Sequence, residues 1–180
     1  MKKFAVMLIS LFMVFSLTGC MPSNQNNATA SVDLVLPTIA GEESGQEVLD
    51  IPEISDADYD DNIDGLCQYL TDAYAVAGDK TQMSYDVIGA ADGYRYLFRY
   101  NKSSVQVEVY AFDIKQLSEE AEQNLESVKA NGMLKVIDRE IRAVISDSGK
   151  YVMIYQDSSA EEANQTQRER VIQLFQAFHS

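Results

Sequence analysis

With 180 residues, of which 46% are apolar, the chain can build the core of one domain with appended segments, so wholesale disorder is excluded. Its 28 acidic and 14 basic side chains give a formal net charge of −14. Nucleic-acid binding depends on basic groups that release counterions from phosphates, and anionic lipid headgroups repel an acidic surface. We therefore expect no nucleic-acid partner and no electrostatic attachment to a membrane.

The N-terminal segment has the pattern of an export signal. Two lysines precede an apolar stretch from Phe4 to Gly19, which is shorter than the roughly 20 residues of a membrane-spanning helix. Residues 17–20, L-T-G-C, resemble the lipobox of bacterial lipoproteins. That resemblance implies a diacylglyceryl group on the Cys20 thiol and cleavage just before this cysteine. An ordinary signal peptide with an accidental cysteine and an uncleaved anchor are the alternatives.

The predicted anchor determines where the chain is expected to lie. Removal of residues 1–19 as a signal peptide takes away two lysines and no acidic residue, so the side-chain charge of the mature chain becomes 12 − 28 = −16. Two acyl chains hold a protein at a membrane without a basic patch, since each buried methylene contributes ~0.8 kcal/mol. We therefore expect a lipid-anchored protein on the extracytoplasmic face of the cell membrane. Cys67 is the one other cysteine, so no intrachain disulfide is expected after lipidation.

Residues 20–55 are predicted to be the lipidated cysteine and a flexible tether. Asn, Ser, Thr, Ala, Gly and Glu dominate this segment, which has no helical or strand period. Residues 32–37, V-D-L-V-L-P, differ because they are apolar and β-prone. One interpretation is that they are disordered or lie on the surface of the domain. The other is that they form an added edge strand. A single folded domain is predicted over residues 56–180.

The acidic stretch at residues 56–65 reads D-A-D-Y-D-D-N-I-D-G and contains the first half of a calcium loop, D-x-N-x-D-G, from Asp60. An EF-hand loop needs a bidentate Glu at its twelfth position, where this chain has Thr71. We favour an acidic helix start, with a calcium-dependent module as the alternative. Gly78 is expected to end this helix. Its apolar positions recur at helical spacing: Ile63, Leu66, Cys67, Leu70, Ala73, Tyr74 and Ala77.

Two strands with alternating side chains are predicted at residues 94–100 and 105–111, joined by N-K-S-S. Placing Tyr100 opposite Val105 makes every aromatic residue of the first strand meet an aliphatic residue on one face. A slip of one residue would destroy this separation, so the faces are well specified. We expect the tyrosines to face the core, with an exposed tyrosine platform for sugar or peptide as the alternative.

The second half of the chain repeats the order of hairpin and helix. A helix with apolar Leu117, Ala121, Leu125 and Val128 is predicted to end at Asn131-Gly132, followed by a short strand at 133–137. Residues 140–146 and 150–156 form a predicted hairpin. A last helix is expected to begin at Ser158 or Ser159 with a capping box. The predicted hairpin partners are Ile145 with Val152 and Ala143 with Ile154, and the predicted inward residues of the last helix are Ala163, Val171, Leu174, Phe175 and Phe178.

Together these patterns predict an α+β fold. We expect an antiparallel sheet of two hairpins, with or without one extra strand, and three helices that lie mainly on one face. Two short motifs, I-G-A-A-D-G at 88–93 and V-E-V-Y-A-F-D at 107–113, are similar to those of small lipoproteins of Gram-positive bacteria whose function is not established. The resemblance covers about half of the chain and implies no activity.

Few residues of this sequence suit catalysis. His179, the one histidine, lies next to the last residue, so a Ser–His or Cys–His site is not expected. Cys67 lies on the apolar face of the first predicted helix, where burial makes a thiol inert. The zinc motifs C-x-x-C and H-E-x-x-H and a glycine-rich phosphate loop are absent from the sequence. We therefore expect no enzyme, no cofactor and no metal site.

The sheet face opposite the tyrosines is the candidate partner-binding site. It is expected to combine arginines with exposed apolar and aromatic groups, which are enriched where partners bind. Coverage by the tether or the first helix, or pairing of the arginines with Glu108, is the alternative. The predicted function is a binding domain for an unknown protein or cell-envelope component; a calcium-dependent module, or an enzyme without an identifiable site, is the alternative. The candidate residues are Arg95, Leu97, Arg99, Arg142, Val144, Tyr151, Met153 and Tyr155.

Overall fold

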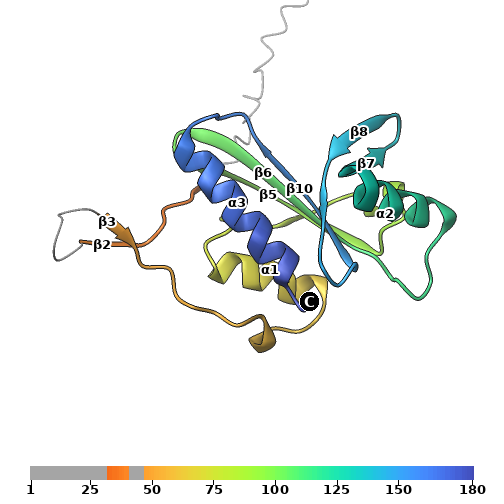
Figure 1. The fold of residues 1–180 in the computed structure, drawn as a ribbon, viewed down its shortest axis with the longest axis horizontal. Coiled ribbons are helices and arrows are strands. Elements are labelled where there is room, and N and C mark those ends of the chain that lie inside the picture. Colours follow the sequence, from red (N-terminus) through yellow and green to blue (C-terminus); the bar gives the residue numbers. More distant parts are fainter. Residues whose placement is uncertain (1–31, 41–46) are drawn as a thin grey trace, which may run out of the picture.

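A six-stranded mixed sheet forms the centre of the structure (Figure 1). The computed structural model describes residues 32–40 and 47–180, so the predicted signal peptide and Cys20 lie outside the described residues. The strand order is β1-β5-β6-β10-β9, and β4 also pairs with β5. The strands of this sheet are β1 (Val32–Asp33), β4 (Thr81–Gln82), β5 (Asp92–Tyr100), β6 (Ser103–Ala111), β9 (Val144–Ile145) and β10 (Tyr151–Asp157).

Helices cover both faces of this sheet. α1 (Ile63–Asp72) and α3 (Glu162–Ala177) pack on the face that carries Tyr96, Val107 and Met153. α2 (Glu119–Asn131) packs on the opposite face together with the hairpin of β7 (Met133–Val136) and β8 (Arg139–Arg142). The predicted α+β class with three helices is confirmed. The predicted sheet of two hairpins is wrong, because six strands join the sheet and one of them, β1, is parallel to its neighbour.

Several short elements complete the fold. β2 (Thr38–Ala40) and β3 (Glu47–Leu49) pair with each other outside the central sheet. Two 3-10 turns, η1 (Asp56–Asp58) and η2 (Tyr85–Ile88), flank α1 and β4. Within residues 32–40 and 47–180, no helix combines the length and the apolar character that crossing a membrane requires.

β5 and β6 form the predicted hairpin, but their pairing lies two residues from the predicted register. Phe98 lies opposite Val105, because Asn101 and Lys102 alone make the turn, with φ angles of 45° and 66°. Left-handed values at both central residues belong to a type I′ turn, whose twist suits a hairpin. A shift of two residues keeps every side chain on its predicted face. Tyr96 is accordingly buried in the core, as predicted.

The apolar stretch within the predicted tether packs against the domain. Val32 and Asp33 pair in parallel with β5, and the Leu34 N–H donates to the Arg99 carbonyl oxygen at 2.7 Å. The Leu34 side chain is only 7% exposed and belongs to the core beneath α1 and α3. Of the interpretations considered for this stretch, the added edge strand is therefore correct for its first two residues.

The connection after α2 follows the prediction closely. Gly132 takes a left-handed conformation with φ of 66°, and its N–H donates to the Val128 carbonyl oxygen at 2.9 Å. At the other end of α2, the Ser118 hydroxyl accepts a hydrogen bond from the Ala121 N–H at 3.1 Å. The short strand predicted at 133–137 is β7.

The second predicted hairpin forms only in part. Ile145 faces Val152 as predicted, but the predicted pair of Ala143 and Ile154 is wrong. The Ala143 N–H instead donates to the Gly132 carbonyl oxygen at 2.9 Å, because the chain before it pairs with β7 rather than with β10. The pairing of β9 with β10 therefore stops after two residue pairs.

α1 is shorter than predicted at both ends. Its N-cap is Asn62, whose side-chain oxygen accepts from the Gly65 N–H at 2.8 Å, so the acidic residues before it lie outside the helix. The helix ends at Asp72 rather than at Gly78, because Tyr74 has a left-handed φ of 52°. Side chains of α3 stabilise this early end: the Gln167 side chain donates to the Tyr74 carbonyl oxygen at 3.1 Å, and Arg170 donates to that of Ala73.

The predicted serine capping box of the last helix does not form. Glu161 is the N-cap of α3 and makes no capping hydrogen bond with its side chain. The Asp157 carboxylate holds the preceding turn instead, because it accepts from the Ser159 N–H at 2.9 Å and from the Asn164 side chain at 2.7 Å. Val171, Phe175 and Phe178 are buried as predicted, Leu174 is half-buried, and Ala163 is exposed, contrary to the prediction.

Candidate binding groove

The residues predicted to bind a partner do not share one face of the sheet. Arg95, Leu97 and Arg99 lie on the predicted face of β5, away from Tyr96. Met153 and Tyr155 lie opposite Val109 and Val107 of β6, which face α1 and α3. Tyr151, Met153 and Tyr155 are therefore buried in the core, and the predicted patch is wrong as one continuous surface.

This error has a physical cause in β10. Its residues 151–155, Y-V-M-I-Y, are apolar on both faces, so no alternation of polarity assigns the faces. A hairpin turn fixes the register of its strands, but β6 and β10 are separated in the chain by α2, β7, β8 and β9. In the structure Met153 faces α3, whereas Val152 and Ile154 face α2.

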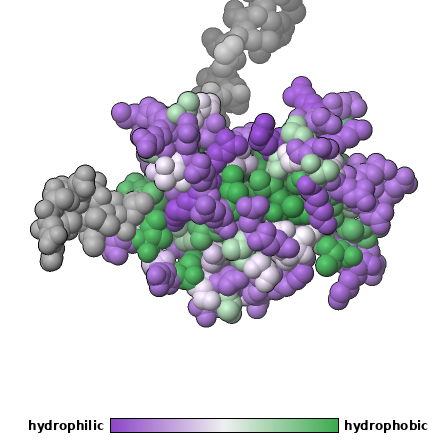
Figure 2. Space-filling view, viewed as in Figure 1, coloured by the Kyte–Doolittle hydropathy of each residue, from purple (hydrophilic) through white to green (hydrophobic). Residues whose placement is uncertain are grey.

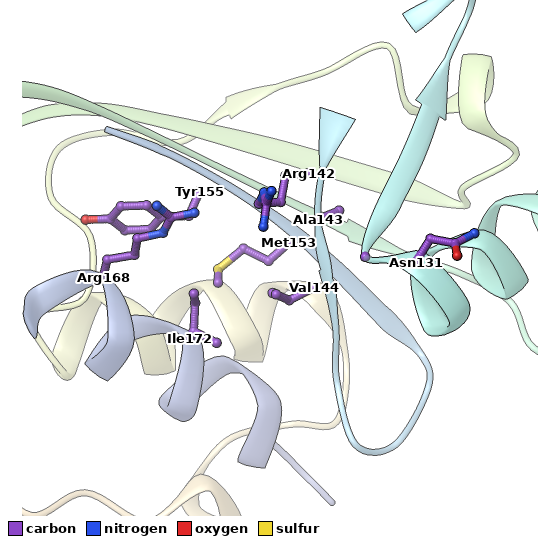
Figure 3. A pocket seen from close by; sticks show the side chains of 9 residues that line it. Asn131, Arg142, Ala143, Val144, Met153, Tyr155, Arg168 and Ile172 are labelled. Atoms are coloured by element: carbon purple, nitrogen blue, oxygen red, sulfur yellow. The ribbon is translucent and has the colours of Figure 1, made fainter. Parts of the chain in front are cut away.

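Some of the predicted residues nevertheless meet in one hollow, between β10 and α3, with a volume of about 290 Å³ (Figure 3). Figure 2 shows apolar side chains gathered in the middle of this face of the molecule, between α3 and the β7–β8 hairpin of Figure 1. We name the hollow the β10 groove. The residues that define it are Arg142, Val144, Met153, Tyr155, Arg168 and Ile172.

Each wall of the β10 groove comes from a different element. Val144 of β9 and Met153 of β10 are cross-strand partners, so their side chains lie side by side. Arg168 and Ile172 are four residues apart on α3 and lie on one flank of the helix. Val144, Met153 and Ile172 point toward one another, and Arg168 lies alongside the Tyr155 ring (Figure 3). The groove therefore has an apolar floor and a basic rim.

The two arginines of the β10 groove form no ion pair within 4.0 Å among the described residues, although Arg168 lies close enough to Asp157 to lower the pKa of that carboxyl. Arg142 is exposed and Arg168 is half-buried. The ion pairs of residues 32–40 and 47–180 involve Lys80, Arg99 and Lys150 instead. The Arg168 guanidinium carbon lies 5.9 Å from the centre of the Tyr155 ring, within the range of a cation–π contact. In a chain with 28 acidic residues, this leaves two guanidinium groups available to an anionic ligand.

The Tyr155 side chain contributes its ring rather than its hydroxyl to the groove. The hydroxyl is buried, has no hydrogen-bond partner in the described part of the chain, and points away from Met153 (Figure 3). Burial raises the pKa of Tyr155 above its usual value, and Asp157 acts in the same direction. The side chain is therefore neutral at physiological pH, and the positive charge of the groove comes from its arginines.

A second polar cluster lies on the opposite face of the sheet, beside a hollow of about 380 Å³. Glu108, 7% exposed, accepts from the Tyr110 hydroxyl at 2.8 Å and from the Gln106 side chain at 2.9 Å. Arg95 lies opposite Glu108 on β5, yet the pair forms no ion pair within 4.0 Å, and the buried Arg95 Nε has no partner among the described residues. Both carboxylate oxygens of Glu108 already accept protein hydrogen bonds. This cluster therefore has fewer free polar groups for binding a ligand than the β10 groove has.

The carboxylates of the acidic stretch at 56–65 make contacts with different parts of the fold. Asp61 accepts from Lys150 and, at 3.0 Å, from the Tyr151 hydroxyl, and the Lys150 contact lowers the pKa of Asp61 despite its burial. Asp64 pairs with Lys80. In residues 32–40 and 47–180 no three His, Cys, Asp or Glu side chains are grouped as a metal site would need.

The residues considered for nucleophilic chemistry each have a role in the fold. Cys67 is a free, buried cysteine of α1, and burial raises the pKa of its thiol. The N–H of His179 donates to the Asp56 carboxylate at 2.8 Å, and its ring nitrogen lies 2.9 Å from the Tyr59 carbonyl oxygen. These contacts of His179 hold residue 179 beside η1 and the residue that follows it.

The β10 groove also contains residues that the sequence did not single out. Arg168 and Ile172 flank the core residue Val171 on α3, and this flanking position is the signal that could have found them. The chain was compared with protein families, with curated proteins and with solved structures, and none of them matches it. The geometry of the groove is therefore the basis for a functional proposal.

Proposed function

We propose that the chain is a lipid-anchored domain on the extracytoplasmic face of the cell membrane, and that it acts by binding rather than by catalysis. Its partner is a protein or another component of the cell envelope, held in the β10 groove. The anchor is supported by the lipobox-like L-T-G-C at residues 17–20, in which Cys20 would carry the diacylglyceryl group. The binding site is supported by the pair of arginines on the rim of an apolar groove.

That pair of arginines is the observation that carries the proposal. A guanidinium group binds carboxylates and phosphates through a planar fork of donors. An apolar floor next to it, here Val144, Met153 and Ile172, stabilises a ligand through burial. Small-molecule sites commonly enclose about 300–1,000 Å³, so the β10 groove, at about 290 Å³, fits a few side chains of a partner.

The anchor is tested by replacing the predicted lipidation site. Full-length chain expressed in bacteria that are fed an alkyne-tagged fatty acid should carry the label and sediment with the membrane fraction. Cys20→Ala should lose the label, because the thiol that receives the diacylglyceryl group is gone, whereas the neighbouring Met21→Ala should keep it. Undiminished labelling of Cys20→Ala would contradict lipidation at this position.

The groove is tested by photo-crosslinking in living cells. A photo-reactive phenylalanine analogue at Ile172, on the groove floor, should give a discrete adduct, and the same analogue at the neighbouring, exposed Gln173 should not. Combining the Ile172 probe with Arg142→Glu and Arg168→Glu should abolish the adduct, while Arg139→Glu on β8 should leave it. Equal adducts at both probe positions, or none at Ile172, would contradict binding in the groove.

A further inference from the structure

β10 has an unpaired edge beyond Met153. On one side β6 pairs with the whole of β10, from Tyr151 to Asp157. On the other side β9 pairs with Val152 and Met153 alone, and no other strand in the described part of the chain pairs with β10 there, although β8 passes within 8 Å of it. The last four residues of β10 therefore have a neighbouring strand on one side only.

The backbone groups of Tyr155 and Asp157 point to the unpaired edge. In an antiparallel pair of strands, successive residues direct their N–H and C=O groups alternately to either side. The Tyr151 carbonyl oxygen accepts from the Ser146 N–H at 2.9 Å, so the odd-numbered residues of β10 face the β9 side. Tyr155 and Asp157 thus offer hydrogen-bond donors and acceptors to an added strand.

The edge is open because the chain before β9 leaves the central sheet. Residues 139–142 form β8 and pair with β7, and the Ala143 N–H donates to the Gly132 carbonyl oxygen. The positions next to Tyr155 and Asp157 that a continuous hairpin would fill are therefore not occupied by β8. At the opposite side of the sheet, β5 has both β1 and β4 along its outer edge.

Hollows on both faces of the sheet meet at this edge. The β10 groove lies on the α3 side, and a second hollow of about 550 Å³ includes Leu97 and Gln156 on the other side. Tyr155 and Arg168 line both hollows. Successive side chains of a strand point to opposite faces of the sheet. An added strand therefore finds room for its side chains on either face.

We propose that the partner supplies an extended peptide segment, with acidic and apolar side chains, which pairs with β10 at Tyr155 and Asp157 as an added strand. This inference rests on the proposed function and specifies the ligand of the same groove. The segment is acidic because Arg142 and Arg168 flank the edge and neither forms an ion pair within 4.0 Å among the described residues. Two copies of the mature chain repel each other, since each has a formal side-chain charge of 12 − 28 = −16, so the segment comes from another molecule.

The test measures peptide binding to the full-length lipoprotein in detergent by fluorescence anisotropy. The probe is a labelled heptapeptide, V-T-E-T-V-T-E, whose Val and Thr residues favour an extended chain and whose alternation places Val and Glu on one face. We expect saturable binding, and binding weaker by about five-fold or more for V-T-K-T-V-T-K. Arg142→Glu and Arg168→Glu should each weaken binding of the acidic peptide to a similar extent, while Arg139→Glu, outside the groove, should not.

Two N-methylated peptides separate strand addition from binding through side chains alone. One is methylated on the amides of its Val and Glu residues, and the other on the amides of its Thr residues. Because alternate amides of a strand point to opposite edges, only one of these sets can face β10. Strand addition predicts that one methylated peptide binds about ten-fold more weakly than the other. Equal affinities of the two peptides would overturn the inference.

The outcomes distinguish this inference from the proposed function. Strand addition would be overturned, and the groove would stand as the binding site, if Ile172 cross-links but the two methylated peptides bind equally well. The same conclusion would follow if Ile172 cross-links but no peptide binds at millimolar concentration. Absence of cross-links at Ile172 would overturn the groove as the natural binding site. A dimer in sedimentation that Arg168→Glu disrupts would assign the edge to a second copy of the chain and overturn the proposed occupant.

Discussion

Removal of the Tyr155 hydroxyl should stabilise the protein, although the residue is buried in the core. The hydroxyl has no hydrogen-bond partner in the described part of the chain, and leaving such a group buried costs about 1–3 kcal/mol. Tyr155→Phe keeps the ring and its contacts, so we expect the free energy of unfolding to rise by about 1 kcal/mol. Tyr110→Phe is the matched control, because the Tyr110 hydroxyl donates to the buried Glu108 carboxylate at 2.8 Å. Losing a hydrogen bond to a charged acceptor should lower the free energy of unfolding by about 2 kcal/mol.

Urea unfolding followed by circular dichroism measures both variants. The thermal midpoints should move apart in the same directions, by about 2–4 °C for each kcal/mol in a domain of this size. An ordinary hydrogen bond contributes ~1 kcal/mol. If Tyr155→Phe lowers the free energy of unfolding by that much or more, the hydroxyl has a partner and the expected stabilisation is wrong.

Three further predictions concern acid, the edge strand and calcium. Burial would raise the pKa of Asp157, but hydrogen bonds from Ser103, the Ser159 amide and Asn164 outweigh burial and lower that pKa. The contribution of Asp157 to stability is therefore present above its unfolded-state pKa and is lost as the pH falls through its folded-state pKa. In urea unfolding at pH 6 and pH 3, which span about the range where aspartates titrate, Asp157→Asn should lose less stability on acidification than wild type. Leu34→Ala should cost about 2 kcal/mol or more because Leu34 is 7% exposed, whereas Val35→Ala, at a position 75% exposed, should cost little in the same assay. Millimolar calcium or EDTA should leave the melting temperature unchanged, and a rise with calcium would revive the calcium-dependent alternative.

Local patterns predicted the elements whose signals lie close together in sequence. The alternation in β5 and β6 assigned the faces of both strands correctly, even though the two-residue turn at Asn101 and Lys102 shifted the pairing. A shift by two residues preserves the faces, which explains why the core position of Tyr96 survived the error. Gly132 likewise marked the end of α2, because a left-handed cap is a local property.

Contacts between distant segments decided what the sequence could not reveal. The early end of α1 involves Gln167 and Arg170 of α3, about a hundred positions later in the chain. The departure of the chain at Ala143 depends on its hydrogen bond with Gly132. The hydrogen bond of Ala143 has no signature in the hydrophobic periodicity of residues 140–146, which suits continued pairing with β10 equally well.

The candidate site was predicted only in fragments for the same reason. Arg142, Met153 and Tyr155 line the β10 groove, but they were grouped with β5 residues that lie on the other face of the sheet. The register between β6 and β10 places Tyr151 and Tyr155 on the same face of the sheet as Tyr96 of β5, and no turn encodes that register. Arg168 was missed because its place beside Tyr155 depends on how α3 crosses the sheet.

Hydrogen exchange at the Tyr155 amide reports on the open edge of β10. In the free protein we expect this amide to exchange faster than those of Ile154 and Gln156, which face β6 within its ladder with β10. Saturation with V-T-E-T-V-T-E should slow exchange at Tyr155 and leave its two neighbours unchanged. If the Tyr155 amide is already as protected as its neighbours in the free protein, or if the bound peptide does not protect it, then β10 does not offer this edge to an added strand.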